Sequence, residues 1–407
     1  MISTGAIGPR QPASRWRARG FLPQDRGPMI PDLSPEDLAI RDTLRRFAES
    51  DLAPKAAALD ESGAFAGAHL PGLAALGVMG LNLPEEWGGT GASALGLVGA
   101  VEEIARACAA TASMVTAHFL ATDAVLLAGS PAQKARYLPE AAAGRLLGAF
   151  ALTEPGAGSS PADMTTRAVD TGESLHLKGT KHFISNAGAA DFIILFARSG
   201  ESGPRPIIDA FILDRDTAGV TFGPPEPTMG MRGGHIFEIA LDCRIPIDRR
   251  LGAAGSGFRT AMQVLDRGRI EVAAMALGIA EAAMEAALRW VRERKIEGQP
   301  LAERQGVQWM LADMATEIEA ARLLTYRAAA LRHSGAAFTR QAAMAKLTAS
   351  ETAGRVADRA LQLHGGYGFS RRLPLERLVR DARILRIYEG ASEVQRNIIA
   401  RLLLREA

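Results

Sequence analysis

The stretch FEIALDCRI, residues 237–245, places an apolar side chain at every second position, with polar or small residues between. This period of two residues predicts a strand with one face in the core and the other toward solvent. Shorter runs bounded by Gly, Asn and Pro predict further strands at 174–177, 181–185, 192–198 and 210–213. No long helical pattern interrupts the zone 149–252, so the sequence predicts a small antiparallel β domain there.

Helical periodicity occupies the chain on both sides of this zone. Ser34, followed by Pro35 and two acids, is a typical helix start. Further helices are expected within 29–148 at 69–76, 94–108, 111–127 and 131–143. Within 253–407 the expected helices are longer, at about 258–295, 302–334, 339–363 and 391–404. The predicted fold class is therefore α+β: an N-terminal helical domain, the β domain and a C-terminal helical bundle with wide buried faces.

The bulk composition describes an ordinary soluble protein and excludes several classes of site. Of 407 residues, 47% are hydrophobic and 23% charged. The net charge of +2 gives no argument for a nucleic acid or an anionic membrane as partner. No uninterrupted apolar stretch approaches the roughly 20 residues of a spanning helix. Cys108 and Cys243 are the two cysteines and lack metal-ligand spacing, which indicates a reducing compartment and no cysteine-based metal site.

The first 28 residues are rich in Arg, Pro, Gly and Ser, with Asp25 as their single acid. A transit peptide is one interpretation of such a segment. It lacks a clear amphipathic period, however. We therefore favour a disordered tail, or a start upstream of a true beginning at Met29.

Three segments offer chemistry. Glu389, in IYEG (387–390), is a lone acid between apolar residues and Gly. Poor hydration there raises the pKa of a carboxyl group and suits it to proton abstraction, although a Glu near a helix start also serves the free N–H groups of the first turn. LTEPGAGSS (152–160) and HGGYGF (364–369) are glycine-rich and serve either as turns or as phosphate or flat-ligand loops. No strand–GxGxxG–helix unit is present, which argues against a Rossmann domain.

Considered together, these segments closely resemble the acyl-CoA dehydrogenase family. The matching motifs cover essentially everything after Met29, in family order: LPEEWGGTG (83–91), LTEPGAGS (152–159), KHFISN (181–186), LDRGR (265–269), ERKxxGxPL (293–301), LADMA (311–315), QLHGGYGF (362–369), RDxR (380–383) and IYEG (387–390). The resemblance implies that the β domain is barrel-like and that the C-terminal bundle has four helices.

It also implies bound FAD and an acyl-CoA substrate that is oxidised between Cα and Cβ to the trans-2-enoyl thioester. Glu389 matches the family's base for the α-proton, and hydride passes to flavin N5. Some relatives carry the base directly before the arginine matched by Arg269; that position is Gly268 here, so Glu389 stands alone. The main-chain N–H of Glu389 and a flavin hydroxyl are expected to stabilise the developing enolate.

The resemblance assigns contacts residue by residue. Expected FAD-binding residues are Phe150, Leu152, Thr153, Gly158, Ser159, Phe183, Ile184, Ser185, Arg294, Gln305, Gln362, Gly365, Gly366, Ala391, Ser392 and Glu393. Arg294 and Gln305 are expected to reach the FAD of a neighbouring subunit. Expected substrate-binding residues are Ser159, Asp266, Arg269, Tyr388, Gly390 and Arg401. The sequence departs from the family pattern at Ser160, Phe183, Ser185, Glu297 and Ala391, and Glu297 puts the contact between subunits in doubt.

Partners implied by the resemblance are an electron-transferring flavoprotein and three further copies of the chain, in the bacterial cytoplasm or the mitochondrial matrix. Alternatives are an oxygen-using oxidase or monooxygenase of this fold and a non-catalytic homologue, which should have lost Glu389. Short or branched acyl groups are expected. His118 and Asp123, inside an apolar stretch, are either satisfied core polar groups or the mark of a polar acyl chain.

Overall fold

The structure, a computed structural model, describes residues 33–202 and 205–406; our expectation for residues 1–28 lies outside them. The chain begins with helices α1 (Pro35–Phe47), η1 (Ala48–Leu52), α2 (Ala53–Ser62), η2 (Ala66–His69), α3 (Leu70–Ala75), η3 (Val78–Gly80), η4 (Glu85–Trp87), α4 (Ala94–Ala107), α5 (Ala109–Ala128) and α6 (Pro131–Ala142). Ser34 caps α1 as predicted. Its Oγ accepts from the N–H of Asp37 at 3.1 Å, and the Asp37 carboxylate accepts from the N–H of Ser34 at 3.1 Å.

The next part of the chain forms one sheet of eight strands. These are β1 (Gly148–Ala151), β2 (Arg167–Asp170), β3 (Ser174–Ser185), β4 (Phe192–Ser202), β5 (Arg205–Asp214), β6 (Val220–Phe222), β7 (Ile236–Pro246) and β8 (Arg250–Leu251), with η5 (Pro161–Asp163) and η6 (Ile247–Arg249) between them. The strand order is β6-β7-β3-β2-β4-β5-β8, with β1 paired to β4. One detail differs from our expectation of an antiparallel domain: the sheet is mixed, because β4 pairs in parallel with β1 and β2. Among the described residues the sheet does not close, so it is barrel-like only in a loose sense.

A β-bulge interrupts β3 at the segment where we expected a separate strand. The two predicted strands, 174–177 and 181–185, are one strand, and its register against β7 shifts between Lys181 and Ile184. Phe183 lies in this bulge with φ 58°, a left-handed conformation that is unusual for a bulky residue. Bulges re-aim side chains out of the regular pleat, and the Phe183 side chain is 55% exposed.

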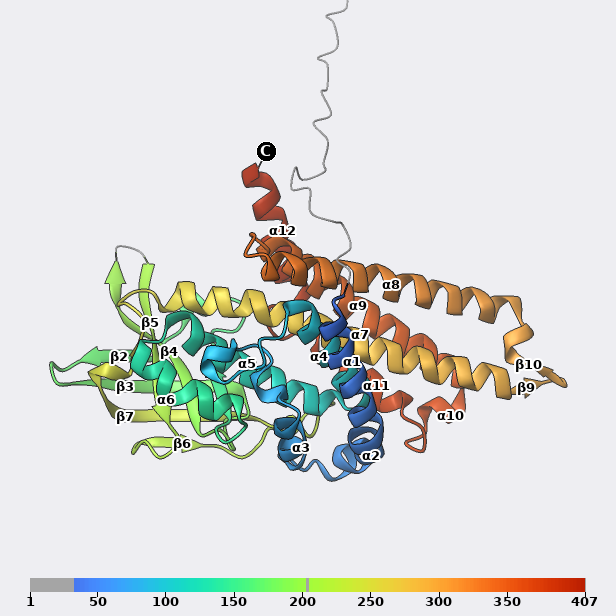
Figure 1. The fold of residues 1–407 in the computed structure, drawn as a ribbon, viewed down its shortest axis with the longest axis horizontal. Coiled ribbons are helices and arrows are strands. Elements are labelled where there is room, and N and C mark those ends of the chain that lie inside the picture. Colours follow the sequence, from blue (N-terminus) through green and yellow to red (C-terminus); the bar gives the residue numbers. More distant parts are fainter. Residues whose placement is uncertain (1–32, 203–204, 407) are drawn as a thin grey trace, which may run out of the picture.

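The C-terminal part is a helical bundle, as predicted. Its helices are α7 (Gly257–Glu293), α8 (Gln305–His333), α9 (Thr339–His364) and α12 (Ser392–Glu406), with α10 (Gly366–Phe369) and α11 (Leu375–Ile384) between the last two. A hairpin of β9 (Lys295–Ile296) and β10 (Gln299–Pro300), followed by η7 (Leu301–Glu303), joins α7 to α8. Figure 1 shows α7, α8 and α9 side by side, with the β domain and the hairpin at opposite ends of the molecule. We had not predicted α11.

Helix α5 is the central core element. By length and composition it could cross a membrane, yet 83% of its apolar window is buried inside the protein. It packs against β1, α4 and α7. These contacts are those of a core helix rather than of a membrane span.

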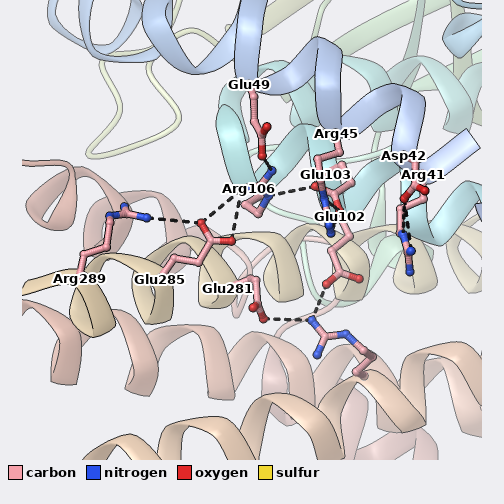
Figure 2. Close-up of polar contacts among 11 residues, drawn as sticks. Arg41, Asp42, Arg45, Glu49, Glu102, Glu103, Arg106, Glu281, Glu285 and Arg289 are labelled. Atoms are coloured by element: carbon pink, nitrogen blue, oxygen red, sulfur yellow. Dashed lines mark hydrogen bonds and ion pairs between the residues drawn. The ribbon is translucent and has the colours of Figure 1, made fainter. Parts of the chain in front are cut away.

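An ion-pair network joins the N-terminal helices to the bundle (Figure 2). Arg106 of α4 donates to Glu103 (2.9 Å), to Glu49 of η1 (2.7 Å) and to Glu285 of α7 (3.2 Å). Arg322 of α8 pairs with Glu102 of α4 at 2.6 Å, and these residues line a cavity of about 520 Å³. None of the predicted site residues lines this cavity. We therefore assign the network to packing between α4, α7 and α8 rather than to the site.

Candidate active site

Glu389 lies in the turn between α11 and α12, with φ 51°. One carboxylate oxygen, Oε2, is enclosed by protein and has no hydrogen-bond partner among the described residues. Burial raises the pKa of Glu389 to about 7, although Lys346 and Arg269 act to lower it. The carboxyl group thus has the raised pKa expected from its apolar neighbours, and it is not occupied by the first turn of α12.

The carboxyl group rests against α7 at Gly268. A Cβ at this position would collide with Glu389 Oε2 and would lie 2.6 Å from Leu120 Cδ2 of α5. The absence of a side chain at Gly268 therefore makes room for the carboxylate. A side chain at position 268 and the carboxylate of Glu389 would therefore compete for the same space.

The main-chain carbonyl of Glu389 has a hydrogen-bond partner, whereas its main-chain N–H has none among the described residues. Its carbonyl accepts from Gln395 Nε2 at 3.0 Å. Its N–H has no acceptor within the part of the chain that the structure describes. A free donor next to a free carboxylate is the pairing that enolate formation requires: one group to take the proton and one to hold the oxygen.

The predicted substrate residues on α7 form an ion pair. Arg269 pairs with Asp266, whose other oxygen accepts from Thr339 Oγ1 at 2.6 Å. Arg269 is only 5% exposed and leaves its Nε without a partner. Arg401 is exposed and close enough to act on the charge of Arg269. Tyr388 directs its hydroxyl toward the sulfur of Met275 at 3.7 Å, which favours packing as its role.

The two segments expected around the flavin ring are neighbours. The N–H of His182 donates to the carbonyl of Thr153 at 2.9 Å, which ties the loop after β1 to the bulge in β3. Phe183 stacks on His182 with ring centroids 4.1 Å apart. None of the residues that the structure describes lies within 4 Å of a Cβ built on Gly156 or Gly158, so packing against them does not explain these glycines. A flat ligand has room beside this loop.

Two other residues expected to bind FAD have buried side chains. The side chains of Leu152 and Ile184 are 6% and 2% exposed, so only their main chain is open to a cofactor. Phe150 packs on Phe196 with centroids 4.9 Å apart and is partly buried. Ser159 is exposed and Ser185 partly buried, so both hydroxyls remain available.

A buried ion pair that we had not predicted fixes the loop. Lys181 Nζ donates to Glu154 at 2.8 Å and to the carbonyl of Leu152 at 3.0 Å. Glu154 also accepts from the main-chain N–H groups of Thr165 (2.6 Å) and Thr166 (3.0 Å). Burial opposes ionisation, but Lys181 and these bonds together hold the pKa of Glu154 at about 2.

The remaining FAD candidates lie in two other places. Ala391 precedes α12, and Ser392 and Glu393 begin it, three and four residues after Glu389; Ser392 Oγ donates to Glu351 at 2.6 Å. Exposed residues also include Arg294 and Gln305, which flank the β9–β10 hairpin and η7 in sequence, and Gln362, Gly365 and Gly366, which lie at the junction of α9 and α10. Figure 1 shows the hairpin and α10 at the end of the molecule opposite the β domain. A Cβ on Gly365 or Gly366 would meet nothing within 4 Å. One chain therefore carries two separated groups of candidates.

Glu297, the departure that put the contact between subunits in doubt, lies in the turn of the β9–β10 hairpin. It adopts φ 53° and pairs with Arg304 at 2.9 Å. Its side chain is 80% exposed.

His118 and Asp123 both have partners in the core. His118 Nδ1 accepts from the N–H of Gly148 at 3.0 Å, and its Nε2 lies 3.2 Å from the carbonyl of Met79. Burial lowers the pKa of His118 to about 4, so it stays neutral. Asp123 accepts from Arg267 at 2.8 Å and from Asn82 at 3.1 Å.

Asp123 belongs to a wider buried network that we had not predicted. Arg332 lies 3.7 Å from Asp123 and 3.3 Å from Glu271, one helical turn after Gly268 on α7. The structure therefore supports the satisfied-core interpretation of both His118 and Asp123. Glu271 could have been noticed in the sequence, because it is a charged residue within an otherwise apolar run of α7.

Three family models match this chain and cover most of it. They are the acyl-CoA dehydrogenase N-terminal domain (residues 34–145), middle domain (149–243) and C-terminal domain (255–404). An acryloyl-CoA reductase (NADH) of Anaerotignum propionicum is 42% identical over 92% of this chain and 95% of its own.

Solved structures of the same fold are also similar to this chain. Butyryl-CoA dehydrogenase from Megasphaera elsdenii has a TM-score of 0.90 at 39% identity, over 92% of this chain and 99% of its own. A chain in a structure described for the electron transferring flavoprotein of Acidaminococcus fermentans has a TM-score of 0.89 at 39% identity, with the same coverage. The chain belongs to the acyl-CoA dehydrogenase family, oxidoreductases that act on a CH–CH bond.

Proposed function

We propose that this chain oxidises a short-chain acyl-CoA thioester to its trans-2-enoyl-CoA, with Glu389 as the base that removes the α-proton. The observation that carries the proposal is the unpartnered Glu389 Oε2, enclosed against Gly268 in a group whose pKa is about 7. Such a base is half ionised near neutral pH, where proton transfer is most effective. A positioned base contributes roughly 10²–10⁴ in rate.

The second contribution comes from the free N–H of Glu389. As the α-proton leaves, negative charge develops on the thioester oxygen, and a fixed donor stabilises that charge at no cost in reorganisation. The base and this donor belong to one residue, so a substrate bound in one pose reaches both. Arg269 and Arg401, together with Ser159, are the groups that we propose for the CoA moiety.

The residues present fit FAD, which accepts the β-hydride when bound. Thr153, Ser159 and Ser185 offer polar groups beside the open space at Gly156 and Gly158. We propose that the exposed ring of Phe183 packs against the flavin. These residues orient the flavin ring and exclude water from the β-carbon.

We propose that the second group of candidates serves the FAD of another copy. These residues lie next to the β9–β10 hairpin in sequence or at the α9–α10 junction, and Figure 1 shows the hairpin and α10 at the opposite end of the molecule from the β domain that carries Phe183. A homo-oligomer, a tetramer by the family resemblance, brings the two groups together. The exposed amides of Gly365 and Gly366 suit a phosphate there. If Arg294 contacts the FAD of another copy, the Arg294→Ala variant should lose FAD more readily than wild type during gel filtration. The midpoint of its thermal unfolding in excess FAD should stay unchanged. FAD retention equal to wild type would argue against a shared site.

The test is the absorption spectrum of the purified protein, followed anaerobically while acyl-CoAs of increasing length are added to wild type and to Glu389→Gln. We expect a flavin spectrum that butyryl-CoA bleaches in wild type and leaves intact in the variant. Bleaching of the variant at the wild-type rate would remove Glu389 from the mechanism. A protein that stays colourless after incubation with FAD would refute the whole proposal.

The electron acceptor that we propose is an electron-transferring flavoprotein. It is tested by reoxidising the bleached enzyme with that flavoprotein, with oxygen or with NAD⁺. Rapid reoxidation by the flavoprotein supports the proposal. Hydrogen peroxide at the turnover rate would indicate an oxidase, and rapid reoxidation by NAD⁺ would indicate a nicotinamide-linked enzyme.

A further inference from the structure

The turn that carries Glu389 is held by two side chains from neighbouring helices. Lys346 of α9 donates its ammonium to the carbonyl of Gly390 at 2.7 Å. Gln395 of α12 donates to the same carbonyl at 2.9 Å and to that of Glu389 at 3.0 Å. Both carbonyls are therefore fixed, while the Glu389 N–H and carboxylate between them stay free.

The conformation of this turn needs such support. Glu389 has φ 51° and Gly390 has φ 93°. A non-glycine residue in the left-handed region is strained and persists when its surroundings hold it there. If the anchors are removed, the turn is expected to relax and to carry the carboxylate away from Gly268.

Lys346 is a buried cation without a carboxylate in direct contact. Its side chain is fully buried, and it makes no ion pair among the residues that the structure describes. An ammonium in such a position requires compensation, and the negative charge that acts on it most strongly is that of Glu389. Burial lowers the pKa of Lys346 to about 8, and Glu389 opposes this, so Lys346 is still a cation at neutral pH.

We propose that Lys346 is a positioning residue: its bond to the Gly390 carbonyl holds the Glu389–Gly390 turn so that the base and its N–H face the substrate, and its charge favours the carboxylate form of Glu389. The inference rests on the proposed role of Glu389. Because one side chain supplies both a hydrogen bond and a charge, two substitutions separate its contributions.

Other charged groups around the turn also influence the pKa of Glu389 or of Lys346. Arg269 of α7 also favours the carboxylate form of Glu389, but Asp266 neutralises much of its charge. The acids that influence Glu389 or Lys346 are Glu271 on α7, Glu351 on α9 and Glu393 on α12. These acids remain in every variant below, so a change in the titration of Glu389 reports on Lys346.

The experiment compares three variants of the FAD-loaded enzyme. Lys346→Gln keeps an N–H donor, on a side chain one atom shorter, but loses the charge, and Lys346→Met loses both. Ser350→Ala, one turn along α9, is the control, because the Ser350 hydroxyl bonds only within its own helix, to Leu347 at 3.3 Å. The readouts are the pH profile of kcat/KM and an infrared difference titration of the Glu389 carboxyl group, with Glu389→Gln subtracted.

Loss of a nearby opposite charge raises the pKa of a carboxylate by about one unit or more. We therefore expect the acid limb of Lys346→Gln, and the infrared titration, to move up by about one pH unit. This corresponds to about a tenfold loss in kcat/KM at pH 6 with the high-pH plateau retained. Lys346→Met should show the same shift and also a lower plateau in kcat at unchanged KM. Ser350→Ala should match wild type.

An acid limb and an infrared titration at the wild-type pH in Lys346→Gln would overturn the inference, whatever the plateau does. Should Lys346→Met fail to fold, Lys346→Gln alone decides through its titration. If instead wild type is bleached by the thioester and Glu389→Gln is bleached equally fast, the proposed function has failed rather than the role of Lys346.

Discussion

Gly268→Ala is the smallest change that tests how the base is accommodated. The added Cβ would lie 2.6 Å from Leu120 Cδ2 and 3.0 Å from Glu389 Cδ. Carbon atoms pack at about 3.5–4.0 Å, so the carboxyl group must retreat by roughly 0.5–1 Å. Leu120 of α5 is 9% exposed, so its side chain has little room to move aside instead.

A displacement of about 1 Å in a reacting group costs on the order of 10²-fold in rate. We therefore expect Gly268→Ala to slow flavin reduction at saturating substrate by about 30- to 100-fold. The assay is anaerobic stopped-flow flavin reduction by butyryl-CoA. Stability is followed in parallel by thermal unfolding, because Ala gains up to about 1 kcal/mol of helix propensity over Gly.

Gly99→Ala is the matched control. Gly99 is a buried helical glycine in α4, and its Cβ would meet Arg41 Cβ and Tyr326 Oη at 3.5 Å, an ordinary contact. This variant should react as fast as wild type. Flavin reduction at the wild-type rate in Gly268→Ala would refute the reasoning, because the carboxylate would then not depend on the space at Gly268.

Three further predictions follow from charged groups. The kcat/KM should fall tenfold per pH unit below about pH 7, where Glu389 is protonated, and level off above it; a profile flat to pH 5 would contradict the raised pKa. Lys181→Met, which leaves Glu154 buried and unpaired, should cost about 3–5 kcal/mol in urea unfolding, and the double variant with Glu154→Gln should recover much of it. Arg106→Met should cost about 1–2 kcal/mol by the same measurement, with a smaller effect in high salt; equal stability at low salt would count against the network in Figure 2.

The helices and most strands could be predicted because their signals are local. The observed α9 begins at Thr339 as expected and ends at His364, one residue beyond the expected end. The bulge at Phe183 could not be predicted, because 181–185 has the composition of an ordinary strand and the shift arises from pairing with β7. The parallel pairing of β1 with β4 is likewise a non-local choice.

The residues of the candidate site also divide into those with a local signal in the sequence and those without one. Glu389 was predicted because its apolar neighbours and its place in IYEG are visible in the sequence. Gln395 was missed because nothing in the sequence shows that its amide folds back onto two carbonyls. Lys346 did leave a signal: it stands among Ala342, Ala343, Ala345 and Ala349 on the buried side of α9. A lysine on an apolar helix face requires a partner, and here that partner is the carbonyl of Gly390.

The location of the proposed base on a loop also explains a constraint on α7. The Glu389 carboxylate occupies the volume into which a side chain at Gly268 would extend. A base delivered from α7 would need no left-handed turn and no anchors such as Lys346 and Gln395, because the helix itself would fix it. A base delivered from the loop needs both, together with a glycine on α7. An acid gained at Gly268 would therefore meet Glu389 in one enclosed site, where two carboxylates cannot both ionise near neutral pH. Proteins of this fold should carry an acid at one of these two positions and a small or neutral residue at the other.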